Sequence, residues 1–121
     1  MADCATLTIG KQGEQIAVEY LRNRNYEIIA RNYRWNRGEV DIIAQLNNML
    51  VFVEVKTARQ KSFGEPETWV DERKQQQIGM VAEHFMDNLP AADLDCRFDV
   101  IAVTIRQNQT KIKHFEDAFW L

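Results

Sequence analysis

Cysteine and histidine are scarce in this sequence, and those present are not spaced as disulfide partners or metal ligands. The two cysteines, Cys4 and Cys96, form no Cys-x-x-Cys pair. His84 and His114 have no partner at metal-binding spacing, so we expect both to be structural or surface residues. We therefore expect reduced thiols, without a disulfide framework or a zinc site.

Long apolar runs are missing as well. No run approaches the roughly 20 residues that a membrane-spanning helix needs. The first 15 residues lack the basic region and long apolar stretch of a secretory signal. We see no internal repeat, low-complexity tract or linker. These absences predict a cytoplasmic protein with no membrane partner, folded as a single domain over residues 1–121.

A strong excess of one charge is the third absence. The net charge is −3, which argues mildly against nucleic-acid binding. Its distribution is uneven, because residues 22–74 carry ten Lys and Arg against eight Asp and Glu, while the rest carries five against ten. The arginines cluster in one short window as Arg22, Arg24, Arg31, Arg34 and Arg37. This window is either an ordinary solvated surface or a basic face beside an acidic site.

The apolar pattern that is present predicts two helices and five strands. We expect helices over 8–23 and 71–88, and strands over 26–35, 39–46, 49–57, 96–105 and 111–119. Thr8 is a suitable helix N-cap, and Gly10 and Gly13 indicate close backbone approach in the first turns. A crossover through the second helix would place the fourth strand parallel to the third, which predicts an α/β fold with a mixed sheet.

The segment GEVDIIAQLNNMLVFVEVKT, residues 38–57, places charged residues inside two apolar strands. A two-residue turn at 47–48 suits Asn, which tolerates positive φ angles. Such a turn places Asp41 directly opposite Glu54, and Glu39 opposite Lys56. Facing carboxylates destabilise a sheet, and a divalent cation between them would remove the repulsion. Oxygen ligands of this kind suit Mg²⁺ or Mn²⁺.

Two further charges complete this candidate site. Lys56 follows Glu54 on the same strand face, where an ammonium can hold a water or neutralise charge on a phosphate. Glu14 lies on the first helix, on or beside the face that should meet the core. These residues together predict hydrolysis of phosphodiester bonds.

A purely structural interpretation stays open. Glu and Lys alternating with Val are common on the solvated face of an antiparallel sheet, and Asp41 could cap a strand end. Glu14 could likewise lie exposed at the edge of the apolar stripe. The structural interpretation is weakened because the acids would oppose each other, and because Ile43 and Phe52 on the same face favour burial.

An Asp, a spacer of twelve residues and then Glu-Val-Lys resembles the Asp…(Asp/Glu)-x-Lys motif of the restriction-endonuclease-like nuclease superfamily. Val40 stands where that motif often has a proline. A closer resemblance covers nearly the whole chain and is to the YraN-like family of small bacterial proteins. It is carried by the ordered segments GKQGEQIAVEYL, ARNYRWNRGEVDIIA, LVFVEVKTA, FGEPE, RFDVIAV and HFEDAFW.

The resemblance implies a restriction-endonuclease-like αβββαβ core with a mixed sheet flanked by helices, and archaeal Holliday-junction resolvases as distant relatives. Carried over by motif, Asp41 and Glu54 would bind the metal, and the main-chain carbonyl of Val55 would assist. Lys56 would position the water, and Glu14 would be an accessory acid.

We therefore expect a Mg²⁺- or Mn²⁺-dependent nuclease that acts on DNA, including branched or damaged DNA. The expected phosphate contacts are Arg31, Arg34, Arg37, Arg59 and Lys74. The polar loop 58–68 would either clamp substrate or simply connect elements, and a homodimer would suit a two-fold substrate. Two alternatives stay open: a non-catalytic nucleic-acid-binding module on the same fold, and a protein-interaction domain whose acids form structural ion pairs.

Overall fold

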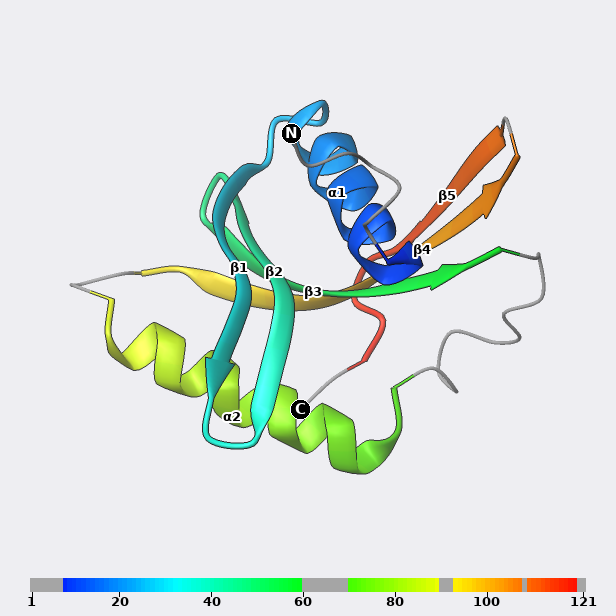
Figure 1. The fold of residues 1–121 in the computed structure, drawn as a ribbon. Coiled ribbons are helices and arrows are strands. Elements are labelled where there is room, and N and C mark those ends of the chain that lie inside the picture. Colours follow the sequence, from blue (N-terminus) through cyan, green and yellow to red (C-terminus); the bar gives the residue numbers. More distant parts are fainter. Residues whose placement is uncertain (1–7, 60–69, 90–92, 108, 120–121) are drawn as a thin grey trace, which may run out of the picture.

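The computed structural model describes residues 8–59, 70–89, 93–107 and 109–119 (Figure 1). The elements, in chain order, are α1 (Ile9–Arg22), β1 (Glu27–Trp35), β2 (Gly38–Leu46), β3 (Met49–Ala58), α2 (Glu72–Asp87), β4 (Asp95–Arg106) and β5 (Gln109–Phe115). The expected order of two helices and five strands is confirmed. The loop expected at 58–68 lies almost wholly outside the described residues, as does Cys4.

The strands form one mixed sheet in the order β1-β2-β3-β4-β5. All neighbours are antiparallel except β3 and β4, which run parallel. The chain returns from β3 to β4 through α2, as a parallel pair requires. Figure 1 shows α1 over one face of the sheet and α2 over the other. This arrangement confirms the α/β fold and is consistent with a restriction-endonuclease-like αβββαβ core.

Neither described helix is long and apolar enough to cross a membrane.

Alternating side chains of the central strands pack into two separate cores, one on each face of the sheet. The core under α1 contains Ala17, Val18, Leu21, Tyr26, Ile42, Ala44, Val51, Val53, Ile101 and Val103. The core under α2 includes Val40, Ile43, Phe52, Ile78, Val81, Ala82, Phe98 and Val100. The period-two pattern of β3 sends its valines toward α1 and Phe52 toward α2. Glu54 shares the face of Phe52, and so it lies on the α2 side.

The predicted helix starts are confirmed by their caps. Thr8 accepts a hydrogen bond from the backbone N–H of Lys11 at 3.2 Å, and Asp71 accepts one from that of Lys74 at 2.8 Å. Of the two early glycines, Gly13 marks a close approach, because an added Cβ would lie 1.9 Å from Thr57 Oγ1. Gly10 does not, since the nearest atom to an added Cβ is 3.9 Å away.

The β1–β2 ribbon changes its faces at Asn32 and Asp41. Val40 and Ile43 both pack in the core under α2 although they are three positions apart, a spacing that puts side chains on opposite faces of a regular strand. Asn32 adopts a positive φ of 50°. The regular partners on either side are Arg31 with Ile42 and Tyr33 with Val40. This ribbon has a register shift between Ile28 and Ala30. Its change of faces, in contrast, lies at the position of the candidate metal ligand.

The end of the last strand differs from the prediction. We expected the strand to reach residue 119, but β5 ends at Phe115 and the chain turns at Asp117, whose φ is 54°. The backbone N–H of Asp117 donates to Asp99 at 3.1 Å, and Phe119 then stacks on Phe98 with ring centroids 5.3 Å apart. Phe119 looked like a strand residue because it is apolar, but its partner is the core under α2.

Candidate functional site

The hairpin that carries the candidate site has the register that the sequence predicted, up to the site itself. Asn47 adopts a positive φ of 55° in the turn, and the regular pairs run from Leu46–Met49 to Ile42–Val53. At the next position, where Asp41 and Glu54 were expected to oppose each other, the regular pairing of β2 with β3 ends. Glu39 pairs with Arg34 of β1 instead, at 3.3 Å, so its expected opposition to Lys56 is not part of the regular pairing.

The side chain of Asp41 bridges the gap that the strands leave. Its Oδ2 accepts a hydrogen bond from the backbone N–H of Val55 at 2.8 Å. A carboxylate thus satisfies a β3 donor where regular pairing with β2 has ended. The same contact brings Asp41 beside the Glu54-Val55-Lys56 segment that the sequence predicted to share its site.

Asp41 and Glu54 line one small cavity of about 160 Å³ between the sheet and α2. Its other lining residues are Arg37, Glu39, Lys74, Gln77 and Ile78. Three acids and two basic side chains thus meet in a space large enough for an ion and a few waters. Glu54 is 5% exposed, so its carboxylate faces the cavity with little contact with bulk water.

The electrostatics of Asp41 show a carboxyl whose charge is poorly compensated. Burial, followed by the charge of Glu54, raises the pKa of Asp41 to about 7. The hydrogen bond from Val55 and the charge of Lys74 act in the opposite direction but are weaker. Glu14 adds a smaller effect in the raising direction, so three carboxylates influence one another. A carboxyl pKa that burial and two neighbouring acids raise toward pH 7 is common at functional sites.

Glu14 reaches this region from the α1 side. Its carboxylate accepts a hydrogen bond from the side-chain amide of Asn32 at 3.1 Å, and Lys11 lies 3.9 Å away. Its side chain is 16% exposed, which agrees with the expected position beside the inward face of the helix. Asn32 is the residue where the ribbon changes faces, so Glu14 supports the irregular backbone next to Asp41.

Lys74, expected to contact phosphate, lines the cavity beside Glu54. Its ammonium forms an ion pair with Glu54. Partial burial acts to lower the pKa of Lys74, but the hydrogen bond and charge of Glu54, with the charge of Asp41, raise it. The sequence carried one signal for this position: Lys74 precedes Ile78 by four residues, which places it on the inward face of α2.

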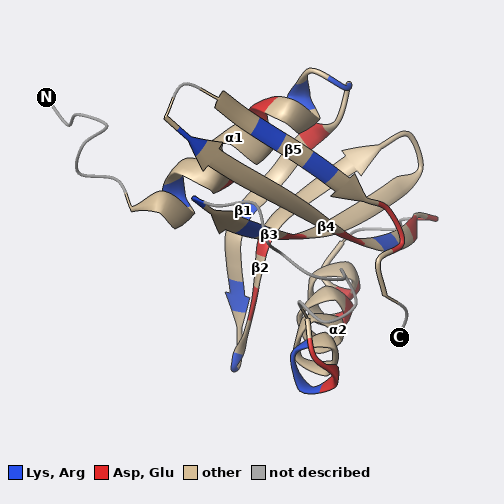
Figure 2. Cartoon of the chain, turned by 90° about the vertical axis from the view of Figure 1, so that its right-hand side faces the viewer, with Lys and Arg blue, Asp and Glu red and all other residues tan. Residues whose placement is uncertain are grey.

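The other basic residues expected to contact phosphate are dispersed around the site. Arg37 lines the cavity, Arg34 pairs with Glu39, and Arg59 is exposed just beyond β3. Arg31 lies toward α1, where it donates to Gln15 at 3.1 Å. Lys56 is half-buried and forms no ion pair with another described residue. Figure 2 shows positive segments on the β1–β2 hairpin and at the near end of α2.

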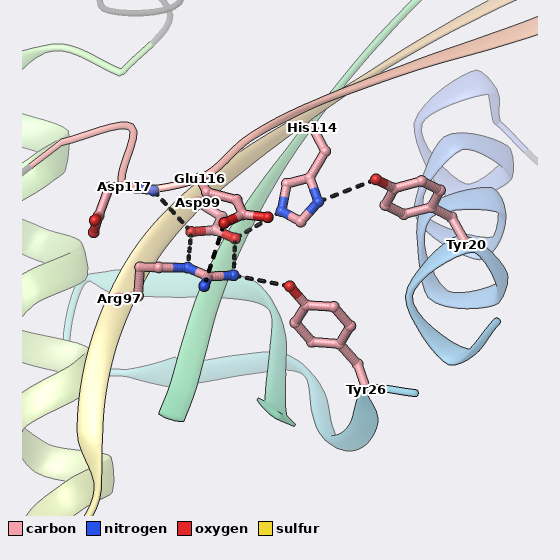
Figure 3. A network of polar contacts seen from close by, with 7 residues as sticks. All are labelled: Tyr20, Tyr26, Arg97, Asp99, His114, Glu116 and Asp117. Atoms are coloured by element: carbon pink, nitrogen blue, oxygen red, sulfur yellow. Dashed lines mark hydrogen bonds and ion pairs between the residues drawn. The ribbon is translucent and has the colours of Figure 1, made fainter. Parts of the chain in front are cut away.

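A second buried carboxylate lies on the opposite face of the sheet and was not predicted (Figure 3). Asp99 is fully buried and accepts hydrogen bonds from Arg97 at 2.8 and 2.9 Å and from the backbone of Asp117. It also meets His114 Nε2 at 2.6 Å. Burial acts to raise the pKa of Asp99, but the hydrogen bonds of His114 and Arg97 outweigh it and lower the pKa.

Tyrosines from the α1 side complete this network. Tyr26 accepts from Arg97 at 2.8 Å, and the hydroxyl of Tyr20 lies 3.2 Å from His114 Nδ1. Glu116 approaches Arg97 at 3.5 Å from the surface. Among the described residues, no buried side-chain nitrogen or oxygen lacks a hydrogen-bond partner. The network therefore reads as a satisfied structural support between α1, β4 and β5.

The donor set around Asp41 determines which cation it could hold. No group of three or more His, Cys, Asp and Glu side chains in the described parts of the chain is arranged as a metal site. Two carboxylates, a main-chain carbonyl and waters would have to suffice, and this is the ligand set typical of Mg²⁺. The residues fit such an ion because its charge would relieve the repulsion that raises the pKa of Asp41.

A larger groove of about 1180 Å³ lies along α2 and β4, away from these acids. Its lining includes Met80, Met86, Cys96 and Phe98. The acids that border it, Glu72, Glu83 and Asp87, are spread along a single helix. Volume alone would favour this groove, but the perturbed carboxyl and its charged partners favour the smaller cavity.

Comparison with known proteins identifies the family. Residues 13–103 match the model described as "Uncharacterised protein family UPF0102". The chain belongs to the UPF0102 family. The matched range contains the whole of the cavity and both acids, and the resemblance to the YraN-like family is thereby confirmed.

Members of the UPF0102 family are similar to this chain over most of their length. A UPF0102 protein of Alkaliphilus oremlandii is 45% identical over 92% of this chain and 97% of its own. One of Christiangramia forsetii is 43% identical over 93% of each chain. One of Thermodesulfovibrio yellowstonii is 40% identical over 96% of this chain and 99% of its own. These names establish a family and leave its activity to be argued from the site.

Proposed function

We propose that this UPF0102 protein is a metal-dependent nuclease that hydrolyses phosphodiester bonds in DNA. The observation that carries the proposal is the pair formed by Asp41 and Glu54 in one cavity, with the pKa of Asp41 raised to about 7 by burial and by Glu54. Asp41 also accepts the backbone N–H of Val55, and Glu54 pairs with Lys74, but these contacts do not offset the burial and repulsion that raise the pKa of Asp41. A divalent cation would turn this repulsion into binding.

Asp41, Glu54 and the main-chain carbonyl of Val55 would hold Mg²⁺ or Mn²⁺. When bound, the ion would supply a Lewis acid for the phosphate and lower the pKa of a water. Lys56 follows Glu54 on β3, and its ammonium would position the attacking water. Glu14 would act as an accessory acid by holding Asn32 and the bend beside Asp41.

Basic residues around the cavity fit a phosphate backbone as ligand. Arg37 borders the cavity directly, Arg34 pairs with the cavity residue Glu39, and Arg59 is exposed just beyond β3. Contacts of this kind supply the sequence-independent part of affinity for nucleic acid. The proposed setting is cytoplasmic DNA, including branched or damaged forms, with a homodimer as the assembly that would present two such cavities to a two-fold substrate.

One observation favours a second candidate, a nucleic-acid-binding module that does not cut. Lys74 already supplies a cation to Glu54, and a permanent ion pair there would leave no need for metal. The raised pKa of Asp41 argues against this alternative, because Lys74 neutralises only part of the acidic pair.

Cleavage assays with matched variants test the proposal. The purified protein is incubated with supercoiled plasmid, single-stranded DNA and four-way junctions, with Mg²⁺, with Mn²⁺ and with a chelator. We expect metal-dependent cleavage that falls by about 10²–10⁴ in Asp41→Asn, in Glu54→Gln and in Lys56→Met.

Glu116→Gln is the matched control, because this acid is 61% exposed and lies in the Asp99 network. It should cut at the wild-type rate. Cleavage that survives unchanged in Asp41→Asn would mean that the activity is not at this site. Salt-sensitive binding of all these DNAs without cleavage in any metal would support the non-cutting module instead.

A further inference from the structure

The end of the β1–β2 hairpin carries an exposed aromatic ring beside the carboxylate cavity. Trp35 is 36% exposed. Its indole stacks on the imidazole of His84 in α2, with ring centroids 4.4 Å apart and an interplanar angle of 13°. A single exposed apolar side chain is ordinary on a protein surface, so the exposure alone assigns no role. The stacking contact with His84, however, holds the indole in a defined orientation.

A second pocket of about 160 Å³ opens beside this indole. It is lined by Trp35, Asn36, Arg37, Gly38, Gln77 and Met80. Arg37 and Gln77 also line the carboxylate cavity, so the two hollows are neighbours that share two side chains. The volume is below the ~300–1,000 Å³ of ordinary small-molecule sites, and it suits one planar ring.

Close packing fixes the two walls of this pocket relative to each other. A Cβ added at Gly38 would lie 2.5 Å from Val81 Cγ2 and 2.9 Å from the carbonyl oxygen of Gln77. The hairpin backbone therefore touches the backbone of α2. Tyr33 adds an edge-to-face contact with Phe85, with ring centroids 5.2 Å apart. The indole on the hairpin and Met80 on the helix are thus held across a preformed gap.

We propose that this pocket binds an unpaired nucleobase of the strand whose phosphate lies at the carboxylate cavity. The inference rests on the proposed function and narrows its substrate to DNA with unpaired nucleotides, as at branches, bulges and single-stranded segments. Trp35 and Met80 would cover the ring, and the side-chain amides of Asn36 and Gln77 would meet its polar edge. Arg37, between the two hollows, would contact the phosphate.

The dimensions and the chemistry agree with this ligand. Gly38 and Asp41 are three residues apart, or about 10 Å along a strand, a distance covered by a few nucleotides at the ~3.4 Å spacing of stacked DNA and by fewer in an extended strand. Stacking on an aromatic side chain accepts any base. A base inside a continuous duplex is already stacked on both sides and must leave the stack to enter such a pocket.

The test compares binding of single-stranded and duplex DNA without divalent metal, so that cleavage plays no part. The probes are a fluorescent oligothymidylate and a blunt duplex hairpin with the same number of phosphates, followed by anisotropy. We expect Trp35→Leu to weaken binding of oligothymidylate about 5- to 150-fold, the effect of losing one base stack. Binding of the duplex should change less than about twofold, and Trp35→Phe should retain most of the affinity.

Ile29→Ala is the control for loss of exposed apolar surface, because Ile29 is 38% exposed on the same strand and should leave binding unchanged. An oligothymidylate with scattered abasic positions completes the test. It should bind wild type more weakly. Trp35→Leu should add little further loss of affinity, because the abasic positions have already removed the base that would stack on the indole.

If Trp35→Leu binds both DNAs like wild type, or loses both equally, the base pocket is refuted while the nuclease proposal stands. If wild type binds neither DNA, both proposals fail together. If Trp35→Leu alters self-association without altering the preference for single strands, the exposed ring serves a second copy of the chain and the base pocket is refuted.

Discussion

Asp41 and Asp99 are two acids of one sheet whose surroundings treat negative charge in opposite ways. Asp99, under α1, is fully buried and surrounded by Arg97, His114 and a backbone N–H, and its pKa is lowered. Asp41, on the α2 side, faces Glu54, and its pKa is raised to about 7. The comparison teaches that burial alone does not identify a functional acid. What distinguishes the two is whether the fold supplies enough positive charge and donors.

The largest expected effect comes from removing the charge of Asp99, the acid whose charge the fold compensates. Asp99→Asn removes the buried charged partner of Arg97 and of His114, and leaves the nearly buried Arg97 beside the exposed Glu116. We expect the free energy of unfolding to fall by about 3–5 kcal/mol, measured by urea denaturation. Mg²⁺ should not change this loss. Glu116→Gln, at the exposed rim of the same network, should cost no more than ~1 kcal/mol.

A loss of less than ~1 kcal/mol in Asp99→Asn would mean that the network contributes little to the stability of the fold. Asp99 could then no longer be distinguished from Asp41 as an acid that stabilises the fold.

The close approach of α1 to β3 at Gly13 positions the helix that contributes to the surroundings of both acids. A Cβ at residue 13 would lie 1.9 Å from Thr57 Oγ1, so Gly13→Ala should displace the helix that carries both Glu14 and Tyr20. We expect a loss of about 1–3 kcal/mol by overpacking, followed by urea denaturation. Gly10→Ala has open space at 3.9 Å and should be neutral or stabilising by up to ~1 kcal/mol. Equal effects of the two substitutions would contradict the close approach.

Asp41→Asn should act with the opposite sign to Asp99→Asn. A folded-state pKa raised above the ordinary 3.8 means that the folded protein binds the extra proton, so this group loses stability as pH rises from about 4 to about 7. Without metal above pH 7, the variant should therefore be more stable than wild type by about 1–2 kcal/mol, below the limit set by 1.36 kcal/mol per pKa unit. Near pH 4 the two should converge.

Thermal unfolding with and without Mg²⁺ or Mn²⁺ completes this measurement. Metal should raise the melting temperature of wild type and not that of the variant, as linkage to a bound ion requires. A variant that is less stable than wild type at pH 8, with no metal effect on either, would identify Asp41 as a structural partner of Val55.

The smallest expected effect concerns Lys74, the cation that the fold does supply to Glu54. Its side chain is 42% exposed, so Lys74→Gln should lower the metal-free stability by no more than ~1 kcal/mol. Removing a charge that competes with a bound cation should enlarge the rise in melting temperature that Mg²⁺ produces. Lys11→Gln, 57% exposed and 3.9 Å from Glu14, is the control. An unchanged metal effect would show that Lys74 does not compete for the acids.

The sequence was informative where contacts are local. The turn at 47–48, the alternation of β3 and the cap at Thr8 depend on neighbours within a few residues, and all were predicted. The meeting of Asp41 with the Glu54 strand followed from the same local rules.

Contacts between distant segments could not be predicted in this way. Lys74 meets Glu54 only because α2 packs on that face of the sheet. The partners of Asp99 come from β4 itself, from β5 and from the turn after β5. The alternation of Arg97 and Asp99 in an apolar strand was the single local sign of them. The early end of β5 has the same origin, since the turn at Asp117 is held by a carboxylate 18 positions earlier.

The change of faces at Asn32 and Asp41 is set by the number of residues in the ribbon more than by their identity. Val40 and Ile43 reach the same core because the strand between them does not alternate regularly. A substitution at Asp41 keeps that count, so it alters charge while the bend remains. Deleting Asp41 would instead put Val40 directly before Ile42, where regular alternation keeps Val40 on the α2 side but removes the bend. The candidate site is therefore built into the length of the chain, and point mutations can remove its chemistry without removing its shape.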